Sequence, residues 1–245
     1  MPPPGYEPFM RAICADPEDD TARLVYADWL DENGDPERAE FIRLQIANSG
    51  LLKKDDPNGL RIEELLQQHG TTWINELPQL PGIGWPRTFH RGFGEAVSVT
   101  SDRGFIEHRK QIFLSAPGRL LSVSEAGEAT LRRLLVVREI ERITGLCLQR
   151  CRVPNGRLEV LTHCPRLANL RWLAMGGRNS GQRRVDLTEE EAREFVATPF
   201  LPNLDAIYFR DWISHETKQL LLTRFKTVVS HCWICSTRPP HSLLP

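Results

Sequence analysis

A short hydrophobic pattern recurs through the second half of the chain. It consists of an apolar residue, two others, an apolar residue, one other, and a final apolar residue. Clear copies occupy 143–148, 170–175 and 204–209, and weaker copies occupy 118–123 and 225–230. Successive copies begin 25, 27, 34 and 21 residues apart, within or near the spacing of leucine-rich repeats. Each copy predicts a short strand with one buried face.

Helix-like segments separate the copies. They lie at 128–137, 155–163, 188–197 and 215–224. One strand-plus-helix unit cannot bury its own apolar face, whereas several units stacked in register make a continuous core. The expected fold is therefore mixed α/β, with a short leucine-rich-repeat-like solenoid and a parallel concave sheet over 92–235, followed by a tail at 236–245. A pair of independent α/β domains is the alternative, and the recurring pattern favours the single solenoid.

Three short helices are predicted within residues 1–50. They cover 9–15, 21–32 and 36–47. Asp19 can cap the second helix, Asn33-Gly34 can end it in a left-handed conformation, and Pro36 suits the first position of the third. The apolar stripe expected on the second helix consists of Leu24, Val25, Trp29 and Leu30. Amphipathic helices joined by so tight a turn must pack together, with the first helix as a lid.

Four sequence pieces in this region carry a family resemblance. They are Ala15-Asp16-Pro17, RLVYADWL from Arg23, Gly34-Asp35, and AEFIRLQ from Ala39. Together they closely resemble the bacterial repeat-companion domain, which is named for the leucine-rich repeats that often follow it. Members of that family carry a similar Arg-Gly-Phe-x-Glu step before their repeats, here Arg91 to Glu95. The resemblance implies a helical cap domain at the N-terminal end of the repeats, and it implies no activity.

The segment 51–91 connects the two parts. A fourth helix is predicted over 58–68, and a series of prolines and glycines with Trp73 and Trp85 follows it. Disordered linkers are poor in aromatic residues, so we expect an irregular connection held in place by the tryptophans. A strand over 96–99 and a helix over 103–114 should then begin the repeats.

Composition is that of an ordinary globular protein, with 40% hydrophobic and 26% charged residues among 245. The N-terminal sequence MPPPGYEP lacks the basic start and apolar core of a signal peptide, and no apolar run is long enough to span a bilayer. We therefore expect a soluble, cytoplasmic protein without membrane association. Six cysteines scattered through such a chain favour reduced, mostly buried thiols over disulfides.

The charge is unevenly distributed. Residues 1–60 hold thirteen acidic and six basic residues, whereas 132–184 hold twelve arginines and three glutamates, a net +9. A basic block can bind nucleic acid, although arginines on repeat surfaces are also an ordinary solvated face, and the solvated face is the favoured interpretation. The residues that would contact phosphates are Arg132, Arg133, Arg150, Arg152, Arg171, Arg183 and Arg184.

Metal binding and catalysis have little support in the sequence. An EF-hand loop beginning at Asp31 is excluded, because Pro36 and Ile42 stand where a glycine and an acid are needed. The metal candidates are Cys232, Cys235 and His241, but zinc needs four convergent ligands and no second Cys-x-x-Cys is present. No serine-hydrolase elbow, zinc-protease motif or phosphate loop occurs. We expect no cofactor, no small-molecule substrate and no enzymatic activity, an enzyme being the least favoured hypothesis.

Binding through the sheet surface is the hypothesis that the repeats favour. In each repeat the third and fifth positions, and the one after the last apolar residue, should face outwards on the concave sheet. Tryptophan, tyrosine and arginine are enriched at binding hot spots. The predicted partner-binding residues are Gln149, Trp172, Tyr208 and Arg210. We expect a protein-interaction module, an adaptor or scaffold with a protein partner. The alternative is a nucleic-acid-associated accessory subunit of a larger ribonucleoprotein or defence complex.

Overall fold

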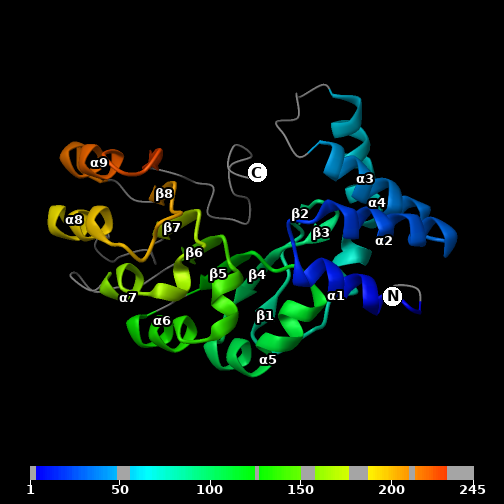
Figure 1. Ribbon diagram of the computed structural model, residues 1–245, viewed down its shortest axis with the longest axis horizontal. Helices are drawn as coiled ribbons and strands as arrows, with labels where there is room; N and C mark the ends of the chain where they lie inside the picture. The colour runs from blue at the N-terminus through cyan, green and yellow to red at the C-terminus, as the bar shows by residue number, and fades with distance from the viewer. Residues whose placement is uncertain are drawn as a thin grey trace.

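The computed structural model describes residues 4–48, 56–124, 127–149, 158–176, 187–209 and 213–230. Within them the chain forms a seven-stranded sheet in the order β1-β4-β5-β6-β7-β8-β9, together with a small β2–β3 hairpin. β1 runs antiparallel to β4, and every later pair of neighbours is parallel. The predicted mixed α/β class is confirmed. Figure 1 shows helices α5 to α9 along the outer side of the curved sheet.

The strands and helices have the following bounds. The strands are β1 Ile83–Gly84, β2 Phe89–His90, β3 Phe93–Gly94, β4 Ala96–Val99, β5 Leu120–Ser124, β6 Gly145–Gln149, β7 Trp172–Gly176, β8 Ala206–Phe209 and β9 Thr227–Val229. The α-helices are α1 Glu7–Ala15, α2 Asp20–Glu32, α3 Pro36–Ala47, α4 Pro57–Asn75, α5 Asp102–Ser115, α6 Glu128–Leu135, α7 Glu159–Thr162, α8 Glu189–Ala197 and α9 His215–Leu222. Two 3₁₀ turns cover Arg138–Arg142 and Pro165–Leu167.

All five copies of the hydrophobic pattern overlap strands, β5 to β9. In the first four copies the last two apolar positions point to the helix side, as Leu146 and Leu148 do in β6, and join the main core with the inner faces of α5 to α9. In the fifth copy Val228 does so. Side chains alternate between the two faces of a strand, so successive residues point in turn to the helix side and to the opposite face of the sheet. The register expected from the sequence is therefore the observed one.

The N-terminal helices pack on one another and on the start of the sheet. Asp19 Oδ1 accepts a hydrogen bond from Thr21 N at 2.8 Å and caps α2, and Gly34 has a φ of +87° just after that helix. The predicted cap and stop are confirmed. The apolar stripe expected on α2 is wrong for Leu24 and Val25, which are 38% and 49% exposed, and is confirmed for Leu30 and Trp29, which pack in the N-terminal core. The buried side chains of α2 are Arg23, Tyr26, Ala27 and Leu30.

Helix α4 is longer than the sequence predicts. It continues through Gly70 to Asn75, because Trp73 and Ile74 are buried beyond the glycine. Trp73 packs with Phe41 of α3, their ring centroids 4.8 Å apart. Helix α4 therefore packs as part of the N-terminal helical unit.

Candidate functional site

The side of the sheet that faces away from helices α5 to α9 carries two rows of side chains, which we call the concave face. Across neighbouring strands the first row consists of Ala96, Leu120, Gly145, Trp172, Ala206 and Thr227. The second row consists of Ser98, Ser122, Cys147, Ala174, Tyr208 and Val229. The apolar members form a cluster separate from the helix-side core. Two predicted binding residues, Trp172 and Tyr208, thus lie in adjacent rows of one face.

Both residues are more buried than the sequence predicts. Trp172 is 7% exposed and Tyr208 4%, so the expectation that they stand free on the sheet is wrong. For Trp172 the local reason is its neighbour on β6: Gly145 pairs with Trp172, and a Cβ at Gly145 would overlap the indole. The indole therefore lies across the adjacent strand instead of projecting outwards. Trp172 and Tyr208 form part of the floor of the concave face.

The remaining predicted binding residues are placed only in part. Gln149 is the last residue of β6, and its backbone pairs with Gly176, but its side chain is outside the described part of the chain. Arg210 follows β8 and is outside it as well.

The two rows of the concave face are most accessible near their ends. The half-buried residues there are Ser98, Thr227 and Val229.

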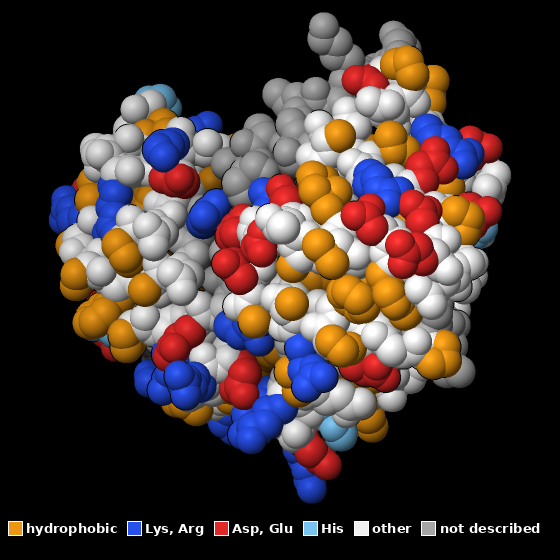
Figure 2. All heavy atoms as spheres, turned by 45° about the vertical axis from the view of Figure 1, so that its right-hand side comes forward, with side chains coloured by type: hydrophobic (Ala, Val, Ile, Leu, Met, Phe, Trp, Pro, Cys, Tyr) orange, Lys and Arg blue, Asp and Glu red, His pale blue; other side chains and the backbone are white. Residues whose placement is uncertain are grey.

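Among the described residues, the arginines of the 132–184 block do not form one continuous basic surface. Arg132 Nη2 lies 2.8 Å from Glu128 Oε1, and Arg133 Nε lies 2.5 Å from Asp102 Oδ2. Arg171 is exposed. Arg150, Arg152, Arg183 and Arg184 lie outside the described residues. Figure 2 shows basic and acidic side chains interspersed over the face that it presents.

The metal candidates Cys232, Cys235 and His241 also lie outside the described residues. Within the described ranges no group of three or more His, Cys, Asp or Glu side chains could hold a metal ion. Cys14 and Cys164 are buried and, among the described residues, form no disulfide. Cys147 is buried in the apolar cluster of the concave face.

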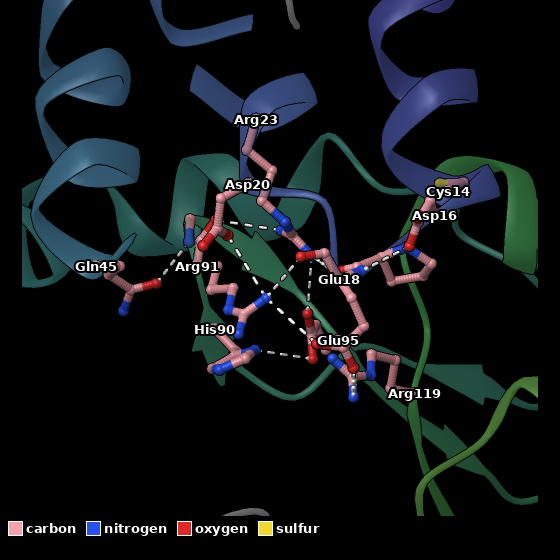
Figure 3. A network of polar contacts seen from close by, with 12 residues as sticks. Cys14, Asp16, Glu18, Asp20, Arg23, Gln45, His90, Arg91, Glu95 and Arg119 are labelled. Carbon is pink, nitrogen blue, oxygen red and sulfur yellow. Dashed lines mark hydrogen bonds and ion pairs between the residues drawn. The ribbon is translucent and has the colours of Figure 1, made fainter. Parts of the chain in front are cut away.

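A buried polar network joins α2 to the start of the sheet, and we call it the polar joint (Figure 3). Its centre is Arg23, which is fully buried and lies with Nη2 3.2 Å from Glu95 Oε1. The same guanidinium donates to the carbonyl oxygens of Pro17 at 2.9 Å and of Arg91 at 3.2 Å. His90 Nδ1 lies 3.2 Å from the other oxygen of Glu95, outside hydrogen-bond geometry. Arg23 therefore holds three segments of chain together.

A second arginine extends the polar joint towards the loop before α2. Arg91 Nη1 donates to the carbonyl oxygen of Glu18 at 3.2 Å and lies 3.3 Å from its carboxylate. Arg119 forms an ion pair with the same carboxylate. The backbone at this point is unusual, since Arg91 has a φ of +47°, a conformation rare for non-glycine residues. The turn is held in place by these side chains.

Gly92 fixes the approach of α3 to the same turn. Its N–H donates to Gln45 Oε1 at 2.7 Å. Gly92 has a φ of +88°, and a Cβ there would overlap Ile42. Only glycine fits both the conformation and the contact.

Burial shapes the titration of the groups around the polar joint. It lowers the pKa of Arg23, and the nearby Glu95 carboxylate opposes that shift by favouring the charged guanidinium. Burial also raises the pKa of the Cys14 thiol to about 11, with Arg142 and Arg23 opposing. A thiol with so high a pKa is a poor nucleophile near neutral pH. Cys14 is also 2% exposed and lies in the core of the N-terminal helices, as a packing residue does.

The sequence indicated one end of the polar joint and missed the rest. Arg91, Gly92 and Glu95 lie in the step that resembles the entrance to the repeats, but their partners are distant in the sequence. The signal for Arg23 was its spacing, because Arg23, Tyr26, Ala27 and Leu30 recur at helical intervals. An arginine in that pattern indicates a buried charge with a partner elsewhere.

Comparison of the chain with protein-family models, with curated protein sequences and with solved structures gave no match. Among the described residues, no helix has both the length and the apolar character required to cross a bilayer. The functional conclusion therefore rests on the geometry of the chain itself.

Proposed function

We propose that this protein is a non-enzymatic interaction module, an adaptor or scaffold subunit that binds a protein partner on its concave face. In this proposal the N-terminal helices are a repeat-companion domain that caps a short leucine-rich-repeat-like solenoid. The strand-and-helix units between 92 and 230 are the repeats. The polar joint fixes the cap to the first of them.

The pairing order of the strands supports the repeat interpretation. Each of β5 to β8 pairs with the next strand in chain order, and helices α5 to α9 all contribute to the core on one side. Each unit then contacts mainly its neighbours, which is the arrangement of a repeat array. Such arrays bind partners on the surface that the helices leave open.

The observation that carries the binding proposal is the apolar character of the concave face. A sheet face in water normally carries polar side chains, whereas this one carries Leu120, Cys147, Trp172, Ala174 and Tyr208 in adjoining rows. These five side chains are 4–7% exposed, so they form an apolar floor beneath a binding surface and are not themselves an exposed patch. Because Trp172 and Tyr208 are already buried, a partner first meets the half-buried side chains at the ends of the rows.

A charge placed at the end of a row tests this proposal. Ser98 is half-buried in the second row, so Ser98→Arg should block a partner while leaving the core intact. The matched control is Val136→Arg, at a residue that is 69% exposed just after α6, outside the concave face. Tagged wild-type and variant proteins would be used to capture partners from the host lysate after nuclease treatment. Loss of the same protein from Ser98→Arg alone supports the proposal, and equal capture by both variants contradicts it.

The alternative is a nucleic-acid-associated accessory subunit that uses the basic block at 132–184. Its support is the net charge of +9 and the exposed Arg171, whereas the ion pairs of Arg132 and Arg133 count against it. Binding through phosphates would weaken steeply as salt rises. Partners that disappear on nuclease treatment, with affinity that falls in Arg171→Gln, would favour this alternative over the protein-binding proposal.

A further inference from the structure

A cavity of about 400 Å³ lies among α1, α4, β3 and the end of α5. Its apolar lining comes from residues such as Met10, Trp73, Leu77 and Phe93. Pockets of roughly 300–1,000 Å³ with a mostly apolar lining and a few polar groups are typical ligand sites. This cavity lies on other elements than the concave face, so the inference drawn from it is independent of the function proposed above.

The polar group that distinguishes the cavity is Arg38, which is 8% exposed and lines it. Its guanidinium carbon lies 4.5 Å from the ring centroid of Trp73, 5.5 Å from that of Phe89 and 5.6 Å from that of Phe93. Aromatic faces attract the positive charge, but they do not accept conventional hydrogen bonds from N–H groups. Nη1 is buried without a hydrogen-bond partner.

An unsatisfied buried donor is costly, so Arg38 is a group that a ligand can satisfy. Two carboxylates also line the cavity, those of Asp35 and Glu76. Burial lowers the pKa of Arg38 to about 10, and nearby Tyr26, Glu76 and Asp35 oppose the shift. The lining therefore combines the positive charge of Arg38, which has an unsatisfied donor, with the negative charges of Asp35 and Glu76.

A neutral peptide group supplies a carbonyl acceptor for Arg38 and an N–H donor, and it carries no net charge. A carboxylate ligand would be attracted by Arg38 but repelled by Asp35 and Glu76, and an amine would meet the opposite problem. The exposed residues of the cavity lining are Leu114, which is 57% exposed, and the polar Glu7, Arg11 and Gln111. A ligand with an apolar side chain would cover Leu114.

We propose that this cavity, the Arg38 pocket, binds a peptide segment that has a neutral backbone carbonyl next to an apolar side chain. The carbonyl oxygen accepts a hydrogen bond from the Arg38 guanidinium, and the side chain packs against Met10, Leu77 and Leu114. Nη1 is covered in the free protein, so the guanidinium turns within its ring of aromatic side chains when the peptide binds.

The test uses three small probes with the full-length protein. N-acetyl-L-leucinamide is neutral, N-acetyl-L-leucine carries a carboxylate, and L-leucinamide carries an amine. Each is titrated while amide and indole N–H resonances are followed by NMR, with the Trp73 indole as the local reporter. The neutral probe should bind about tenfold more tightly than either charged one, which corresponds to about 1.4 kcal/mol.

Two leucine variants control the location of binding. Leu114→Glu places a charge at the mouth of the Arg38 pocket and should weaken binding of N-acetyl-L-leucinamide about tenfold. Leu222→Glu makes the same change on α9, at a residue that is 39% exposed, and should bind like the wild type. Absence of binding to the wild-type protein, tighter binding of a charged probe, or equal affinity in the two variants would overturn the proposal.

Discussion

Replacing Arg23 with methionine should separate the contribution of the polar joint from that of ordinary packing. Methionine keeps an apolar stem of similar length beside Phe93, whose ring centroid lies 5.0 Å from the guanidinium. The substitution removes the ion pair to Glu95 and the hydrogen bonds to two backbone carbonyls. Glu95, 2% exposed, would then have lost its arginine partner.

The expected loss of stability is large because the pair is buried on both sides. Removing one partner of a buried ion pair costs about 3–5 kcal/mol. An exposed ion pair is worth roughly 1 kcal/mol or less. Arg43 supplies the comparison within the same helical unit, since it pairs with Asp28 and Asp31 and its side chain is 39% exposed. Arg23→Met should therefore destabilise the protein by several times as much as Arg43→Met.

The free energy of unfolding of both variants is measured by urea denaturation followed by tryptophan fluorescence. Urea is chosen because it is uncharged and does not screen ion pairs. A double-mutant cycle with Glu95→Gln isolates the pair itself. The double variant should be less destabilised than the sum of the two single variants, by about 1–3 kcal/mol. The assigned role of the polar joint would be refuted if Arg23→Met lost no more than about 1 kcal/mol of unfolding free energy beyond the loss in Arg43→Met. It would also be refuted if the losses in Arg23→Met and Glu95→Gln simply added in the double variant.

Three further outcomes are expected. Gly92→Ala should destabilise the chain by about 1–3 kcal/mol more than Gly34→Ala in the same urea assay, because both glycines have positive φ but only a Cβ at Gly92 meets a neighbour; equal costs would contradict this. Gly145→Val should cost about 1–3 kcal/mol by overpacking the Trp172 indole, and adding Trp172→Ala should relieve part of that overlap, which a double-mutant cycle would detect. The unfolded Cys14 thiol ionises above pH 9.0 while the folded thiol stays protonated to about pH 11. Stability should therefore fall by about 2–3 kcal/mol more in the wild type than in Cys14→Ala as pH rises across that interval, with no such difference below it; parallel profiles would contradict the burial of Cys14.

The strands were predictable from the sequence because their signal is local. In each copy of the pattern the alternation of apolar positions assigns residues to one side of the sheet, and Leu146 and Cys147 lie on the expected opposite faces. Exposure was not predictable, because it depends on a neighbouring strand. Nothing in the sequence near Trp172 indicates that Gly145, on the strand before it, leaves room for the indole.

The same contrast between local signals and contacts with distant residues holds for the N-terminal helices. The cap at Asp19 and the stop at Gly34 are short-range features, and the sequence identified both. The buried side of α2 was predicted wrongly because the choice of Leu24 and Val25 followed hydrophobicity alone. Arg23 is buried instead, through contacts with residues 68 and 72 positions away, and such partners are not evident in a single sequence.

Protection of the concave face by a bound partner is the most direct test of the proposed function. Ser98→Cys and Val136→Cys would each be labelled with a maleimide, in purified protein and in the complex captured from nuclease-treated lysate. Mass spectrometry of the peptides resolves each site from the native cysteines. A partner on the concave face should slow labelling at position 98 and leave position 136 unchanged. Equal labelling at position 98 in the free and bound protein would contradict binding at the concave face.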